Sequence, residues 1–188
     1  MTGALAAGRT VTALLAAGPA VTGAVAPGQV SARTLVIGFG NSLRSDDGIG
    51  WSAAERLADD PRRGATQVIR RQQLTPELSL DISAASLVVF IDASSVVAAG
   101  EVTVRMLTAV PGSAAWTHHM TPEALLAMTR DLYAATPDAT LVSIGADSFA
   151  VGDGLSPAVE RALPVALDIV LALIKEHVQA EPREHADA

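Results

Sequence analysis

Short apolar runs alternate with helical patterns from Thr34 onward. A continuous apolar run that ends in glycine or in a polar residue is typical of a strand buried on both faces of a sheet. Such runs predict parallel strands at 34–38, 66–70, 86–94 and 139–145. Residues 100–107 alternate apolar and polar side chains, which predicts an edge strand or one half of a hairpin.

Helical patterns lie between these strands, at 47–60, 75–85, 121–135 and 156–177. Three of these helices are expected to begin with a hydroxyl residue followed by proline, so we predict N-caps at Thr75, Thr121 and Ser156. Strands that alternate with helices form right-handed crossovers. The sequence therefore predicts an α/β fold, with a mostly parallel sheet covered by helices on both faces.

The two ends of the chain differ from this core. Residues 1–33 are rich in Ala, Gly, Val and Thr and have no clear periodicity, so we expect a disordered or loosely attached extension. The alternative is a cryptic export or membrane-surface segment, but Gly and Pro interrupt its apolar stretch, which predicts no membrane span. Residues 178–188 form a polar tail, which leaves a single domain at 34–177.

The composition excludes several classes of function. The chain has 188 residues, a formal net charge of −7 and no cysteine. The lack of cysteine excludes a disulfide scaffold, a thiolate zinc site, an iron–sulfur cluster and a cysteine nucleophile. Nucleic-acid binding needs clustered Lys and Arg, whereas this chain is acidic and its basic residues are scattered. We therefore expect no nucleic-acid partner.

The loop after the first predicted strand, GFGNSLRSDDGIG, is the most informative segment. Its glycines could cradle a phosphate, but a dinucleotide-binding fingerprint needs glycine where Leu43 stands. At the helix start, Asp46 and Asp47 would repel a pyrophosphate, so the phosphate interpretation fails. An aspartate pair can also be an N-cap and a first-turn acid. That alternative leaves the two glycines and the asparagine in front of it unexplained.

Polar groups also lie next to two other predicted elements. Asp92 directly follows an apolar run, and His118 and His119 precede the helix expected at 121–135. Taken singly, Asp92 could cap a turn and the histidine pair could be incidental. In a doubly wound sheet, however, ligands bind in the crevice beyond the carboxyl ends of the strands, where these groups would gather. Two carboxylates and one imidazole suit a first-row divalent ion with open positions for water or substrate.

In these motifs the chain resembles the hydrogenase maturation proteases, the endopeptidases that trim the large subunit of nickel–iron hydrogenases. GFGNSLRSDDGIG is the most specific match, and LVVFIDAS, THHM and LSPAVERALPVAL follow in the family's order. The resemblance covers about residues 34–177. It implies a three-layer α/β/α fold around a mostly parallel twisted sheet, phosphorylase/hydrolase-like, and a cytoplasmic hydrolase.

The resemblance also implies a metal-dependent site. The family's metal-contacting residues match Asp47, Asp92 and His118, and His118 is preferred to His119 because the family pattern is Thr-His-x-Met. These residues would act through nickel that the precursor of the hydrogenase large subunit already carries, so the free protein need not bind a metal tightly. The protease then removes a short C-terminal peptide from the precursor.

Other residues of the same motif would have supporting roles. Gly38, Gly40 and Asn41 would shape a groove for the precursor's tail, and Asp46 would cap the following helix. The loops at 71–76 and 145–148 depart from the family's usual sequences and could rim the groove, so the hydrogenase class stays open. The alternative function is a non-catalytic, metal-dependent binding or chaperone module on the same fold. Whether an aspartate serves as general base is also open.

Overall fold

The computed structural model describes residues 33–110 and 120–180 of the chain. Its strands are β1 (Thr34–Phe39), β2 (Gln67–Arg71), β3 (Leu87–Ser94), β4 (Val102–Leu107) and β5 (Asp138–Gly145). Its α-helices are α1 (Ile49–Ala58), α2 (Leu78–Ser83), α3 (Pro122–Tyr133) and α4 (Pro157–Ala180), joined by the 3-10 helices η1 (Ser45–Gly48) and η2 (Pro61–Arg63). Every strand and helix predicted from the sequence pattern within these residues is present.

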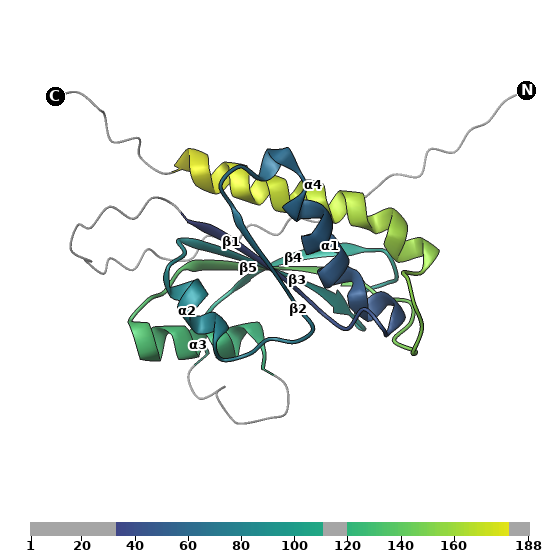
Figure 1. Cartoon of the computed structure of the whole chain (residues 1–188), viewed down its shortest axis with the longest axis horizontal. Helices are drawn as coiled ribbons and strands as arrows, with labels where there is room; N and C mark the ends of the chain where they lie inside the picture. The colour runs from purple at the N-terminus through teal and green to yellow at the C-terminus, as the bar shows by residue number, and fades with distance from the viewer. Residues whose placement is uncertain (1–32, 111–119, 181–188) are drawn as a thin grey trace, which may run out of the picture.

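The strands form one sheet in the order β2-β1-β3-β5-β4 (Figure 1). β1 pairs in parallel with β2 and β3, and β3 pairs in parallel with β5. β4 lies at one edge and pairs antiparallel with β5, which confirms the edge strand expected from its alternating side chains. The chain leaves β1 toward β2 but continues on the other side of β1 at β3. The order of the strands therefore reverses between β1 and β3.

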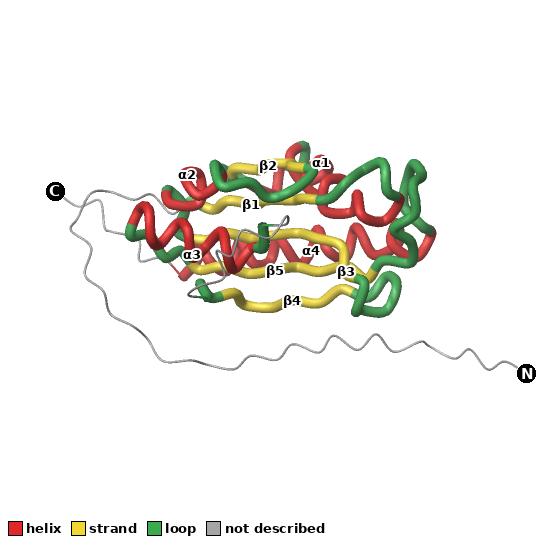
Figure 2. The backbone as a smooth tube through the Cα atoms, turned by 90° about the horizontal axis from the view of Figure 1, so that it is seen from below, coloured by secondary structure: helices red, strands yellow, loops and turns green. Residues whose placement is uncertain are grey.

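Helices cover both faces of the sheet, which confirms the three-layer architecture. Figure 1 shows α1 and α4 on one side of the strands and α2 and α3 on the other, and Figure 2 shows the strands side by side between β2 and β4. The alternation of side chains along each strand divides the apolar core accordingly. In β1, Val36 faces α1 and α4, whereas Leu35 and Ile37 face α2 and α3.

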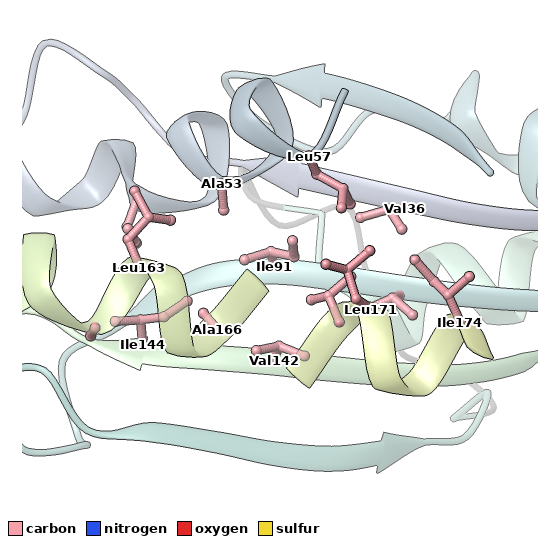
Figure 3. Packing of buried hydrophobic residues seen from close by; sticks show 14 of the residues in the cluster. Val36, Ala53, Leu57, Ile91, Val142, Ile144, Leu163, Ala166, Leu171 and Ile174 are labelled. Atoms are coloured by element: carbon pink, nitrogen blue, oxygen red, sulfur yellow. The ribbon is translucent and has the colours of Figure 1, made fainter. Parts of the chain in front are cut away.

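The core on the α1 and α4 side is continuous along the sheet. Figure 3 shows Val36, Ile91 and Val142 of three neighbouring strands packed against Leu163 and other residues of the helices. These side chains are almost completely buried. The longest helix, α4, thus covers the sheet from the carboxyl ends to the amino ends of the strands.

One of the three predicted hydroxyl caps is confirmed: Thr121 caps α3, because its Oγ1 accepts a hydrogen bond from the Ala124 N–H at 3.2 Å. α4 begins directly after Ser156, as predicted, but the buried Oγ of Ser156 forms no capping hydrogen bond. The cap predicted at Thr75 is wrong. The Thr75 carbonyl accepts from the Leu78 N–H in a turn, and α2 begins only at Leu78.

Two further sequence expectations concern the ends of the chain. The closing helix α4 continues to Ala180, three residues beyond the predicted end at 177. Residues 1–32 and 181–188 lie outside the described residues, so the extension and the tail stay predictions. None of the helices in the described ranges is both long and apolar enough to cross a membrane.

Candidate active site

A groove of about 760 Å³ lies at the carboxyl ends of β1 and β3. This is the point where the strand order reverses, and parallel α/β sheets bind their ligands there. The lining residues come from the loops after β1, β2, β3 and β5 and from the start of α3. The volume lies within the usual range of ligand sites. Asp47 and Asp92, which the sequence placed after two different strands, both line this groove.

The loop after β1 is folded so that Asp47 faces the groove. Gly40 has φ of +135°, and a Cβ at this position would lie 1.8 Å from the Asp47 carbonyl oxygen. Only glycine therefore allows the loop to close this tightly. The Asn41 N–H donates to Asp47 Oδ2 at 3.0 Å, and Asn41 Oδ1 accepts from the Leu43 N–H at 3.0 Å. Gly40 and Asn41 also line the groove, as the sequence predicted.

Gly38 has a different place from the other two predicted groove residues. It lies in β1 beneath α1, where an added Cβ would approach the Gly50 carbonyl oxygen to 2.0 Å. It is not among the residues that line the groove. Its observed contact is thus the close packing of α1 on the sheet.

Asp92 is half-buried near the end of β3. Its Oδ1 accepts one hydrogen bond, from the Ala93 N–H at 2.8 Å. The pKa of Asp92 is raised to about 7, mainly by burial and to a smaller extent by the charge of Asp47, while the hydrogen bond from the Ala93 N–H acts in the opposite direction. A carboxylate in this state holds a proton near neutral pH and gains from any cation that enters the groove.

The third predicted ligand cannot be placed beside these two. His118 and His119 lie at positions 111–119, outside the described residues, so their role stays a prediction. Met120 and Thr121 follow directly and line the groove. Within residues 33–110 and 120–180, no three His, Asp or Glu side chains form a cluster that could hold a metal ion. The described part of the site consists of Asp47 and Asp92.

The role predicted for Asp46 is wrong. Neither η1 nor α1 receives a hydrogen bond from a capping side chain, and the Asp46 side chain points instead to the loop between β5 and α4. There its carboxylate accepts the backbone N–H groups of Asp147, Ser148 and Ser156, at 2.9, 3.0 and 2.6 Å. Burial raises the pKa of Asp46, but these hydrogen bonds outweigh it, so that the pKa lies below its usual value.

Of the two loops that depart from the family pattern, the one at 71–76 rims the groove, as expected, through Gln72, Gln73 and Leu74. No residue of the loop at 145–148 lines the groove, whereas Phe149, which follows that loop, does. Arg44 also lines the groove, and no pattern in the sequence indicated this. Its guanidinium donates to the Phe149 carbonyl oxygen from Nε at 3.2 Å and from Nη2 at 3.1 Å. The groove thus combines two carboxylates, one guanidinium and an apolar wall.

Solved structures with this fold include several hydrogenase maturation proteases. The endopeptidase HybD from E. coli is 28% identical over 77% of this chain and 93% of its own, with a TM-score of 0.63. The hydrogenase 2 maturation peptidase from a Thaumarchaeota archaeon is 25% identical, with coverages of 76% and 98% and a TM-score of 0.60. HycI from Thermococcus kodakarensis, a [NiFe] hydrogenase maturation protease, is 23% identical over 76% and 92%, also at a TM-score of 0.60. No family model matches the sequence, and no curated protein sequence matches it.

Proposed function

From the premise that this chain belongs to the hydrogenase maturation protease family, we propose that it cleaves a short C-terminal peptide from the precursor of a nickel–iron hydrogenase large subunit. The substrate is the precursor after nickel has been inserted, and the protease recognises it through that ion. The observation that carries the proposal is the convergence of Asp47 and Asp92, from two separate strand ends, on one groove.

The groove has the chemistry that such a substrate requires. A nickel ion carried by the precursor needs ligands from the protease, and Asp47 and Asp92 offer hard oxygen ligands while His118 would offer an imidazole. The raised pKa of Asp92 fits this role, because an incoming cation stabilises the ionised carboxylate and displaces its proton. The Asn41 N–H, which donates to Asp47, fixes the orientation of that carboxylate before the substrate arrives.

The peptide bond would be cleaved by water. The chain has no cysteine, and it has no Gly-x-Ser-x-Gly motif to present a serine nucleophile. The substrate's ion can polarise the scissile carbonyl or lower the pKa of the attacking water. Asp92 would take up a proton, since burial and the neighbouring Asp47 favour its protonated form. The apolar wall and the loop glutamines would hold the precursor's tail.

Mass spectrometry of the precursor tests this proposal. The protein is mixed with nickel-loaded and with nickel-free large-subunit precursor, and a small loss of mass is measured over time. We expect cleavage of the loaded precursor only. Asp47→Asn, Asp92→Asn and His118→Ala should each lower the rate by about a hundredfold or more while the protein stays folded.

Two control variants accompany these measurements. Asp131→Asn changes an exposed carboxylate on α3 and should leave cleavage unchanged. His119→Ala should also remain active; an inactive His119→Ala together with an active His118→Ala would move the ligand assignment to His119. Binding of the loaded precursor without any loss of mass would contradict proteolysis and support the non-catalytic alternative.

A further inference from the structure

Asp46 joins two loops that are more than a hundred residues apart in the sequence. Its carboxylate is completely buried and accepts hydrogen bonds on both oxygens. Oδ2 binds the N–H groups of Asp147 and Ser148, and Oδ1 binds that of Ser156. The arrangement is reciprocal, because the Asp46 N–H donates to the Ser148 carbonyl oxygen at 3.2 Å. We call the Asp46 carboxylate and its three N–H donors the clasp.

Hydrogen bonds from neighbouring residues extend the contact between the two loops. The Ser45 N–H donates to the Gly152 carbonyl oxygen at 2.9 Å, and the Gly152 N–H donates to the Leu43 carbonyl oxygen at 3.1 Å. Ser45 Oγ donates to the Ala150 carbonyl oxygen at 3.2 Å. The backbone of Leu43 and Ser45 is therefore hydrogen-bonded to the loop after β5 in the way that two neighbouring strands are.

The clasp is directly connected to two residues that line the groove. Asp47 is the next residue in the chain, and its N–H donates to the Arg44 carbonyl oxygen at 3.1 Å. On the other loop, Phe149 follows Ser148, and the Arg44 guanidinium holds its carbonyl oxygen. The backbone on both sides of Phe149 is thus held by the segment that carries Asp47. A groove carboxylate and the groove wall form one hydrogen-bonded unit.

We propose that Asp46 is a positioning residue for the cleavage reaction: through the clasp it fixes Asp47 and Phe149 in the groove at the places where substrate binds. Asp46 itself has no contact with the groove and is not a catalytic residue. The kinetic part of this inference rests on the proposed function. Its structural part concerns the free protein alone.

A carboxylate suits this role better than any neutral side chain. Three N–H donors converge on two oxygens, and an ionised carboxylate can accept all of them. An asparagine would keep one acceptor oxygen and would turn its NH₂ toward one of the donors. Asp46→Asn should therefore weaken the clasp, and Asp46→Ala should remove it.

The control must lose stability at a distance from the groove. Ile174 is 5% exposed and lies in α4 (Figure 3). Near the same end of α4, His177 Nε2 is 2.9 Å from the hydroxyl of Ser86, which lies just before β3. This is the opposite end of the sheet from the groove. Ile174→Ala removes core contacts there and leaves the clasp intact.

The experiment combines kinetics with amide measurements on the full-length protein. Cleavage of nickel-loaded precursor gives kcat/KM for the wild type, Asp46→Asn, Asp46→Ala and Ile174→Ala at a temperature where all are folded. A displacement of catalytic groups by about 1 Å lowers a rate by about a hundredfold. We expect kcat/KM of Asp46→Asn to fall about 10- to 100-fold below that of Ile174→Ala. Equal values for the two variants would overturn the inference.

Hydrogen exchange and amide chemical shifts of the free protein give an independent reading. In the wild type, the Asp147, Ser148 and Ser156 amides should be protected, and unprotected amides would overturn the inference even if no variant folds. In Asp46→Asn, the Asp47 and Phe149 signals should shift, while in Ile174→Ala they should stay in place. Wild-type protein that cleaves no precursor would defeat the proposed function, and these shifts would still decide whether Asp46 positions the groove.

Discussion

Two carboxylates at the same end of the sheet, those of Asp46 in the clasp and Asp92 in the groove, meet opposite surroundings. The Asp46 carboxylate is fully buried and accepts three backbone N–H groups, and its pKa lies below the usual value. The Asp92 carboxylate is only half-buried and accepts one N–H, yet its pKa is raised to about 7. The group that is less accessible to solvent is thus the more acidic one.

The difference shows that several backbone hydrogen bonds can keep a carboxylate charged although solvent does not reach it. In the clasp, backbone dipoles replace the lost water, so the charge is stable and takes part in the architecture. In the groove, Asp92 has lost water without gaining enough donors, and Asp47 adds a second negative charge nearby. An incompletely solvated carboxylate of this kind is available to bind a cation or a proton.

Removal of each carboxylate provides the strongest test of this contrast. Asp46→Ala leaves three buried N–H groups without an acceptor, and the free energy of unfolding should fall by about 3 kcal/mol or more. Asp92→Asn removes a charge that burial disfavours, so its stability at pH 8 should stay within about 1 kcal/mol of the wild type or exceed it. Urea denaturation measures both values. A larger loss for Asp92→Asn than for Asp46→Ala would reverse the comparison.

The pH dependence of stability should have opposite signs for the two groups. The folded pKa of Asp92 lies above its unfolded value, so between about pH 4 and 7 the folded state retains a proton that the unfolded state has lost. Asp92 therefore lowers stability progressively as the pH rises through this window. The folded pKa of Asp46 is lowered, so its contribution is present above the unfolded pKa and is lost as the pH falls through the folded value.

Activity should follow the same titration. A proton on Asp92 competes with the substrate's ion, so kcat/KM should fall by about tenfold for each pH unit below the pKa of Asp92. Carbon NMR of the Asp92 carboxyl locates that pKa, and denaturation at pH 5 and pH 8 compares the wild type with Asp92→Asn. An Asp92 that titrates near pH 4, with a flat stability difference between the two proteins, would contradict the assignment.

The fold could be predicted because its signals are local. The run at 86–94 is apolar without interruption, and this alone indicates a central strand, observed as β3. The alternation at 100–107 distinguished the antiparallel edge strand β4 from the parallel strands. The rule that ligands gather at the carboxyl ends of parallel strands then brought Asp47 and Asp92 together without any knowledge of their distance.

The role of Asp46 could not be predicted, because its partners are backbone groups in a remote loop. Its position before a helix is compatible with an N-cap, and nothing in the residues around it indicates Asp147 or Ser156. Sequence patterns identify side-chain chemistry, whereas any residue can supply an N–H. The cap expected at Thr75 is absent because α2 begins three residues later than the pattern suggested, at Leu78, after a turn in which the Thr75 carbonyl accepts from the Leu78 N–H.

Ser45, which precedes Asp46 but is not part of the clasp, offers the test with the smallest expected effect. Ser45 has φ of +47°, a left-handed conformation that costs a non-glycine residue about 1 kcal/mol, and its hydroxyl donates to the Ala150 carbonyl oxygen. Ser45→Ala loses the hydrogen bond and keeps the strain, so stability should fall by about 1 kcal/mol. Ser45→Gly loses the same bond but relieves the strain, and its stability should stay within about 0.5 kcal/mol of the wild type.

The informative quantity is the difference between the two Ser45 variants, because both lack the hydroxyl. A glycine variant about 1 kcal/mol more stable than the alanine variant in urea denaturation would establish the left-handed backbone in solution. Equal stabilities would mean that the backbone at Ser45 relaxes to negative φ, and the loop would then no longer follow the course that brings Asp46 to its three donors. In either case, Asp46→Ala should lower the free energy of unfolding about three times as much as Ser45→Ala does. The reason is that water can replace the lost hydrogen bond of the Ser45 hydroxyl but not those of the buried Asp46 carboxylate.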